Sequence, residues 1–480
     1  MPSLLNLNEF LALFSVKYLS TVPIISSKSF VINTIFVFAT INFMAKPVSG
    51  FSKKTKEEKI NWLVSTFLED SPTSISTLKQ YWNTDEKLQK LHDGFIENTI
   101  SNYYLPFAIA PNFLINNRIY TIPMVIEESS VVAAASNAAK FWLDKGGFTT
   151  KVISTIKNGQ IHINFFGNDK YFQDFFSEIR PTLIESISDI ERNMKKRGGG
   201  LLDISLINST KALEGYYQLH CTFETQDAMG ANFINTCLEE IAKTFESLSK
   251  SYSVFVKENK YPEVAISILS NYVPECLVRA TVQCPVEALS TPEIKGKIFA
   301  DKFTRAVAIA KVEPRRAVTH NKGIMNGIDA VILATGNDFR AVEAGVHAYA
   351  SKNGSYSSLT YANVKDNVFT FGIEIPLALG TIGGLTSLHP LVKLAFDILQ
   401  KPNAKKLMQI VAVAGLAQNF AAIRSLVTTG IQKGHMKMHL MNILNQLEAT
   451  SSEIEKATSY FKDNTISHSS VVSFIEKNRS

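Results

Sequence analysis

Cysteine is scarce in this sequence. Only four cysteines stand among the 480 residues, and no two of them form the C-x-x-C pair of a zinc site. Their density is also far below that of a secreted disulfide scaffold. We therefore expect small, buried, reduced thiols and a cytoplasmic protein; the four are Cys221, Cys237, Cys276 and Cys284.

A strong charge of either sign is missing too. The formal net charge is +6, and the densest basic clusters, Lys53-Lys54 and Lys195-Lys196-Arg197, are short. Nucleic-acid binding would need a longer basic stripe interleaved with aromatic residues, so we do not expect that function. With 45% hydrophobic and 19% charged residues the chain can bury a large core, and its length favours two or three domains.

Residues 30–44 fall short of a membrane span. This apolar run has fifteen residues and is interrupted by Asn33 and Asn42, whereas a spanning helix needs about 18–20 apolar residues. No A-x-A cleavage site follows it, so we expect neither an anchor nor a signal peptide. Because Met44-Ala45-Lys46-Pro47 resembles an alternative start, residues 1–43 are expected to be an over-extended reading frame or a disordered tail. Mass spectrometry of the natively expressed protein should then find a chain beginning near Met44.

The order of apolar patterns predicts a mixed α+β protein. No G-x-G-x-x-G follows a predicted strand, so the Rossmann fingerprint is absent. Apolar spacing and turn residues predict a strand pair around Asn116-Asn117 and a helix over 131–143, capped by Ser129 or Ser130. The remaining predicted helices are 60–68, 74–91, 171–194, 232–250, 292–312, 407–447 and 452–461, and the remaining strands are 160–166, 202–208, 215–225, 277–284, 329–334 and 368–375.

The most informative segment runs from His320 to Gly327 and on to Thr335-Gly336-Asn337-Asp338. It places Lys322 and Asp338 sixteen residues apart among small residues. A lysine ammonium can stabilise the negative oxygen that develops in carbonyl chemistry, and a nearby carboxylate keeps the ammonium protonated. Most isolated pairs of this kind are surface ion pairs without a function, so the accompanying motifs decide the interpretation.

Further motifs accompany this segment in a fixed order. They are Glu127-Glu128 at the start of the Ala-rich helix, the loop Asp227-Ala228-Met229-Gly230-Ala231-Asn232, the turn Gly380-Thr381-Ile382-Gly383-Gly384, and residues 415–420 with 431–436. In this order and spacing the segments closely resemble class II 3-hydroxy-3-methylglutaryl-coenzyme A (HMG-CoA) reductases, from about residue 57 to near the C-terminus.

This resemblance implies an α+β architecture with an inserted domain. A large helical and mixed domain that binds the coenzyme A ester would comprise residues 44–154 and 269–430. A small ferredoxin-like α+β domain that binds the dinucleotide would comprise 155–268, and a helical C-terminal flap would comprise 431–480. The resemblance also implies a homodimer or an assembly of dimers with active sites shared across the interface.

The resemblance also implies a role for each motif residue. Lys322 would polarise the carbonyl oxygen, Asp338 would position Lys322, Glu128 would donate a proton near the carbonyl, and His435 would protonate the departing coenzyme A thiolate. Contacts to the hydroxymethylglutaryl group would come from Ser130, Arg316 and Asn326. The NADH or NADPH site would use Asp227, Met229, Gly230, Ala231 and Asn232, and the sequence leaves the choice between the two cofactors open.

His435 and His439 allow a second interpretation, because they stand four residues apart, as metal ligands on a helix do. The H-E-x-x-H glutamate is missing and no third ligand is evident, so we expect no metal. Three positions depart from the family pattern: Ser129 replaces a usual Pro, Ser101 a usual Gly, and Phe339 a common Trp. None of these changes removes a proton carrier.

The implied function is interconversion of HMG-CoA with mevalonate plus coenzyme A, using two equivalents of NAD(P)H. The sequence does not set the direction in the cell. Two alternatives remain: an acyl-coenzyme A hydrolase or transferase that moves no hydride, and a non-catalytic coenzyme A-binding regulator. No nucleic acid and no membrane is expected among the partners.

Overall fold

The computed structural model describes residues 47–68, 71–428, 440–462 and 464–479. The chain divides into two compact units, residues 1–104 and 105–480. The predicted N-terminal extension, residues 1–43, lies outside the described residues. The first unit ends inside the segment 44–154 that we assigned to the large domain, and the domain assignment stays a prediction.

The described part of the first unit is helical. It contains the 3-10 helix η1 (Phe51–Lys53), α3 (Lys56–Phe67), α4 (Pro72–Gln80) and α5 (Glu86–Asp93). The single helix predicted over 74–91 is wrong, because the chain turns between α4 and α5. Asp85 ends this turn: its carboxylate accepts from the amides of Lys87 and Leu88 and so caps a new helix.

The main core of the second unit packs helices against two small sheets. Strands β1 (Phe107–Ile115) and β2 (Arg118–Val125) form the predicted hairpin, whose turn residues Asn116 and Asn117 have φ of 47° and 63°. A four-stranded antiparallel sheet has the order β3-β8-β10-β9. Its strands are β3 (Thr149–Val152), β8 (Leu277–Pro285), β9 (Thr360–Lys365) and β10 (Val368–Pro376).

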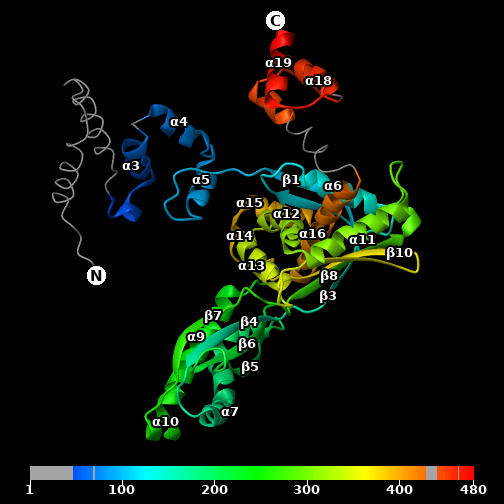
Figure 1. The fold of residues 1–480 in the computed structure, drawn as a ribbon. Helices are drawn as coiled ribbons and strands as arrows, with labels where there is room; N and C mark the ends of the chain where they lie inside the picture. The colour runs from blue at the N-terminus through cyan, green and yellow to red at the C-terminus, as the bar shows by residue number, and fades with distance from the viewer. Residues whose placement is uncertain (1–46, 69–70, 429–439, 463, 480) are drawn as a thin grey trace, which may run out of the picture. The chain divides into compact units, whose positions relative to one another are not determined.

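Two long helices, α12 and α16, pack against each other in this core (Figure 1). The strand predicted over 329–334 is wrong, because these residues form the last turns of α12 (Pro314–Ala334). After Asp329 the segment is a short apolar run, most of it buried, and such a run does not distinguish a buried helix from a buried strand. The neighbouring helices are α6 (Val131–Leu143), α11 (Gly296–Val312), α13 (Phe339–Ala350), α14 (Leu385–Leu388) and α15 (Pro390–Ile398), and η2 (Val286–Leu289) is a 3-10 turn.

Helix α16 (Ala404–Val427) is long and apolar enough to cross a membrane by length and composition alone, the one such helix among the described residues. Fifteen of its residues are buried within the protein, and it packs on α12, α6 and β8. The burial is that of a core helix. The predicted helix 407–447 begins three residues late, and its middle, 429–439, lies outside the described residues.

Residues 157–269 form a separate sheet with its own core. Strands β4 (Lys157–Asn164), β5 (Gly200–Asn208), β6 (Tyr216–Glu224) and β7 (Glu263–Leu269) are ordered β5-β6-β4-β7. Helices α7 (Asp169–Ser186) and α9 (Ala231–Ser251) pack on the sheet and on each other, next to α8 (Ser188–Lys195) and α10 (Ser253–Glu258) (Figure 1). Strand and helix order is that of the ferredoxin-like β-α-β-β-α-β motif.

The cysteines are buried, free thiols, as their scarcity predicted. Burial raises the pKa of Cys276 to about 11, so this thiol is neutral at physiological pH. Near the C-terminus, α18 (Ser451–Tyr460) and α19 (His468–Arg479) enclose a small apolar cluster around Leu444, Ala457 and Val471.

Candidate active site

The structure brings together three residues that the sequence predicted for the site. The Lys322 ammonium lies 2.5 Å from the Glu128 carboxylate, and the Asn326 amide nitrogen lies 3.4 Å from the same carboxylate oxygen. Lys322 and Asn326 are one helical turn apart on α12, so they face the same side. The side chains of Lys322 and Glu128 are 59% and 38% exposed, so both remain accessible to a ligand.

Glu128 is positioned by a tight turn between β2 and α6. Helix α6 begins after Ser130, whose φ of 74° is unusual for a residue other than glycine. Ser130 occupies the N-cap position, one of the two that the sequence predicted, but its hydroxyl makes no capping hydrogen bond. At the other end of α6, the Gly147 amide donates to the Trp142 carbonyl past the last residue of the helix, and Gly146 and Gly147 have positive φ.

Arg316 lies near the start of α12, away from Lys322. Glu313 caps the helix and accepts from the amides of Arg315 and Arg316. Lys322 follows Arg316 by six positions in the helix, so at about 100° per residue the two side chains point about a third of a turn apart. No hydrogen bond or ion pair within the described residues joins Arg316 or Ser130 to the Lys322 cluster. Their contact with a substrate stays a prediction.

Asp338 caps the next helix. Its carboxylate accepts from the amides of Arg340 and Ala341 and pairs with the Arg340 guanidinium at 3.2 Å. Partial burial raises the pKa of Asp338, but the hydrogen bonds and the charge of Arg340 outweigh that effect and hold the pKa below its usual value. The structure thus pairs Asp338 with Arg340, and the coupling of Asp338 to Lys322 stays a prediction.

A short turn joins the end of α12, the helix that carries Lys322, to Asp338 at the start of α13. Gly336, with φ of 64°, ends α12, and Asn337 Oδ1 accepts from the Gly380 amide at 2.8 Å. This short turn therefore fixes the Gly380–Gly384 turn to the end of the helix that bears Lys322. Sequence analysis did not identify this role of Asn337.

His320 anchors α12 two residues before Lys322. Its Nε2 lies 2.6 Å from the Thr360 hydroxyl and 2.9 Å from the Ser358 hydroxyl. Burial, together with the charge of Arg316, lowers the pKa of His320 to about 3. A neutral, hydrogen-bonded imidazole is therefore part of the frame that holds Lys322.

The loop predicted for the dinucleotide lies against the Gly380–Gly384 turn. Thr381 donates to the Asp227 carbonyl at 2.8 Å, and Ala228 forms a β-bridge with Ile382. A Cβ at Gly380 would come within 2.5 Å of the Met229 amide nitrogen, so only glycine allows this approach. The loop ends at Gly230, whose φ of 96° turns the chain into α9.

One residue beneath this loop escaped sequence analysis. Lys157 is 4% exposed, and its ammonium bonds to the Thr225 hydroxyl and, at 3.0 Å, to the Ala228 carbonyl. A signal for it exists: alternate residues of β4, namely Lys157, Gly159, Ile161 and Ile163, form its buried face, and Lys157 is in phase with them. His435 and His439 lie outside the described residues. Among the residues described, no group of three or more His, Cys, Asp or Glu side chains could hold a metal ion.

Comparisons with known proteins identify the family. The model of the hydroxymethylglutaryl-coenzyme A reductase family matches residues 57–440. The 3-hydroxy-3-methylglutaryl-coenzyme A reductase of Archaeoglobus fulgidus is 37% identical over 414 residues, which cover 86% of this chain and 90% of that protein. The counterpart from Pyrococcus horikoshii is 25% identical over 71% of this chain and 82% of that protein.

A solved structure agrees with these sequence comparisons. The class II reductase of Streptococcus pneumoniae, bound to NADPH in open conformations, is 36% identical, and the match has a TM-score of 0.65 over 80% of this chain and 100% of that one. The family prediction made from the motifs is therefore confirmed. The chain belongs to the hydroxymethylglutaryl-coenzyme A reductase family.

Proposed function

We propose that this enzyme reduces HMG-CoA to mevalonate and free coenzyme A with two equivalents of NADH or NADPH. The observation that carries the proposal is the contact of Lys322, Glu128 and Asn326 at an accessible position, in a chain whose family is established. Conversion of a thioester to an alcohol takes four electrons. Two dinucleotides supply them as two hydrides, and two protons complete the alcohol and the thiol.

Lys322 would stabilise the negative charge that develops during the reaction, and Glu128 would supply a proton. Each hydride addition leaves a negative oxygen at the former carbonyl, and an ammonium aimed at it stabilises the transition state. Glu128, hydrogen-bonded to Lys322, would donate a proton to that oxygen. Asp338 would hold Lys322 in place, and His435 would protonate the thiolate. Ser130, Arg316 and Asn326 would bind the hydroxymethylglutaryl group, Arg316 through a bidentate guanidinium–carboxylate contact.

The loop Asp227–Asn232 fits a dinucleotide. Gly230 exposes the start of α9 without a side-chain cap, so amide donors at a positive helix end are available for a pyrophosphate. Asp227 fixes the loop to the main core, because its Oδ1 accepts from the Ala404 amide at 2.8 Å. Similarity to the NADPH-bound Streptococcus pneumoniae enzyme supports the same assignment.

A single assay tests the proposal against its rival. We expect oxidation of NADH or NADPH, followed at the nicotinamide absorbance band, only when HMG-CoA is present, with two equivalents consumed per thiol released. An acyl-coenzyme A hydrolase or transferase would release thiol with no change in that band. A regulator that only binds coenzyme A would do neither, and either result would overturn the proposal.

We propose a cytoplasmic homodimer, or an assembly of dimers, with sites shared between subunits. The buried free thiols suit a reducing compartment, and the family resemblance supports the assembly. The domains would divide the work as predicted: 44–154 and 269–430 for the coenzyme A ester, 155–268 for the dinucleotide and 431–480 as a flap. A fully active monomer in sedimentation experiments would contradict the shared site.

A further inference from the structure

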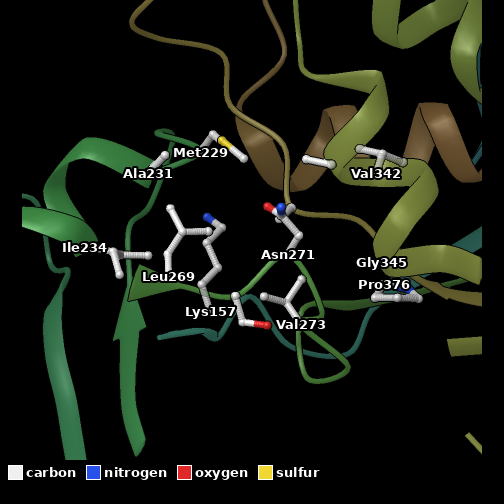
Figure 2. A pocket seen from close by; sticks show the side chains of 13 residues that line it. Lys157, Met229, Ala231, Ile234, Leu269, Asn271, Val273, Val342, Gly345 and Pro376 are labelled. Atoms are coloured by element: carbon white, nitrogen blue, oxygen red, sulfur yellow. The ribbon is translucent and has the colours of Figure 1, made fainter. Parts of the chain in front are cut away.

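A buried ammonium lies directly beneath the loop proposed to bind the dinucleotide. Lys157 is the first residue of β4, and it pairs with Phe223 near the end of β6. From there its side chain extends towards the loop that carries Met229 and Ala231 (Figure 2). A buried charge is costly unless hydrogen bonds satisfy it. The local contacts of Lys157 therefore have to be specific.

The ammonium completes a three-membered hydrogen-bond network. Lys157 donates to the Thr225 hydroxyl and to the Ala228 carbonyl, and Thr225 Oγ1 donates to the same carbonyl at 2.7 Å. The Ala228 amide in turn donates to the Thr225 carbonyl at 3.0 Å. Burial lowers the pKa of Lys157, while the negative charges of Glu224 and Asp227 oppose that shift. All donors and acceptors of this network belong to the protein.

The Thr225 side chain lies against Gly230 at the start of α9. A Cβ added to Gly230 would lie 2.5 Å from the Thr225 methyl carbon, so the two residues are in close contact. Gly230 is the N-cap of α9. Fixing Thr225 therefore also fixes the direction in which the first amides of α9 point.

The space beside Lys157 is too small for a ligand. The cavity that Lys157 lines with Met229, Asn271, Val342 and other residues has a volume of about 20 Å³ (Figure 2), room for about one water molecule. A dinucleotide cannot reach the ammonium from this side. Lys157 can therefore influence the ligand only through the backbone that it holds.

We propose that Lys157 is a positioning residue that fixes the Thr225–Gly230 turn, and with it the start of α9, in the conformation that binds the dinucleotide. The inference rests on the proposed function, because it assumes that this loop binds NADH or NADPH. It assigns to Lys157 no contact with either substrate.

Substitution in the full-length chain tests the inference. Lys157→Met keeps the length of the side chain but removes the charge and its hydrogen bonds. We expect the Kd for NADPH or NADH, titrated by nicotinamide fluorescence, to rise about tenfold or more, and the KM for HMG-CoA to change less than twofold. Lys157→Arg, which can still donate, should recover part of the affinity. Lys243→Met on α9 is the matched control, since the Lys243 side chain is 80% exposed.

A second pair of variants decides the outcome if Lys157→Met does not fold. Thr225→Val removes the hydroxyl, which accepts from Lys157 and donates to the Ala228 carbonyl, but keeps the methyl beside Gly230, so it should weaken dinucleotide binding in the same direction. Thr225→Ser keeps the hydroxyl and loses that methyl, so it should bind the dinucleotide more tightly than Thr225→Val. A folded Lys157→Met with unchanged dinucleotide affinity, or equal losses for both substrates, would overturn the inference alone. A wild-type protein that binds neither NADPH nor NADH would overturn the proposed function and the inference together.

Discussion

Lys322 and Lys157 show two different uses of an ammonium group. Lys322 is 59% exposed and pairs with a carboxylate, whereas Lys157 is 4% exposed and bonds to a neutral hydroxyl and a carbonyl. The Lys322 side chain therefore remains accessible to solvent and to a new oxygen. The Lys157 ammonium instead donates its hydrogen bonds to a hydroxyl and a backbone carbonyl oxygen of its own chain. Exposure and partner type, rather than residue type, separate a group suited to chemistry from one suited to holding a loop.

The largest effect that we expect comes from the exposed lysine. Lys322→Met should lower kcat by about 10³-fold, because a preorganised donor at a developing oxyanion is worth about 10²–10³ in rate. The melting temperature should hardly change, since exposed ion pairs contribute about 0–1 kcal/mol. Steady-state oxidation of NAD(P)H and thermal unfolding measure the two quantities. Activity within tenfold of wild type would remove Lys322 from the chemistry.

Glu128→Gln should have the next largest effect. The amide keeps the shape and can still contact Lys322, but it cannot donate a proton as an acid, so kcat should fall about 10²-fold. HMG-CoA binding, measured by calorimetry, should stay within a few-fold. Glu127→Gln is the matched control, because Glu127 is its exposed neighbour. Turnover of Glu128→Gln near the wild-type rate would assign the proton to another group.

The two lysines also show how far the sequence could predict the site. The motif around Lys322 was recognisable because its residues are close in sequence and specific to a family. The Glu128 contact spans 194 residues, and only the family resemblance placed these two residues at one site. Lys157 lies outside every motif, and its role depends on the Thr225 turn, 68 residues away. Pattern alone predicts that Lys157 faces the core but not what it meets there.

Errors in the fold prediction have a similar physical origin. Strong local signals gave the right element: Asn116-Asn117 predicted a hairpin, and Ala-rich spacing predicted α6. The strand predicted over 329–334 was wrong because a short, mostly buried apolar run has no diagnostic period. The helix predicted over 74–91 was wrong because the capping potential of Asp85 was overlooked.

A buried acid extends the comparison to pH. Burial and then Glu343, which shares a hydrogen bond with Asp329, raise the pKa of Asp329 to about 8. Between pH 3.8 and about 8 the folded protein holds a proton that the unfolded chain has lost, so this group's contribution makes stability fall as pH rises. Asp329→Asn should flatten that slope in denaturant unfolding at pH 5 and pH 8, and exposed Asp301→Asn should not. An unchanged slope would show that Asp329 is already ionised.

The smallest effect should come from the exposed partner of Asp338. Arg340 and Asp338 are 77% and 42% exposed, so Arg340→Met should change the free energy of unfolding by less than about 1 kcal/mol. Because the pKa of Asp338 is lowered in the fold, that contribution is present above about pH 4 and is lost as pH falls below it. Denaturant unfolding at pH 7 and pH 3 measures both values. The kcat of Arg340→Met should stay within about twofold of the wild-type value if Asp338 acts through Lys322. A large loss of kcat in this variant would instead place Arg340 in the active site.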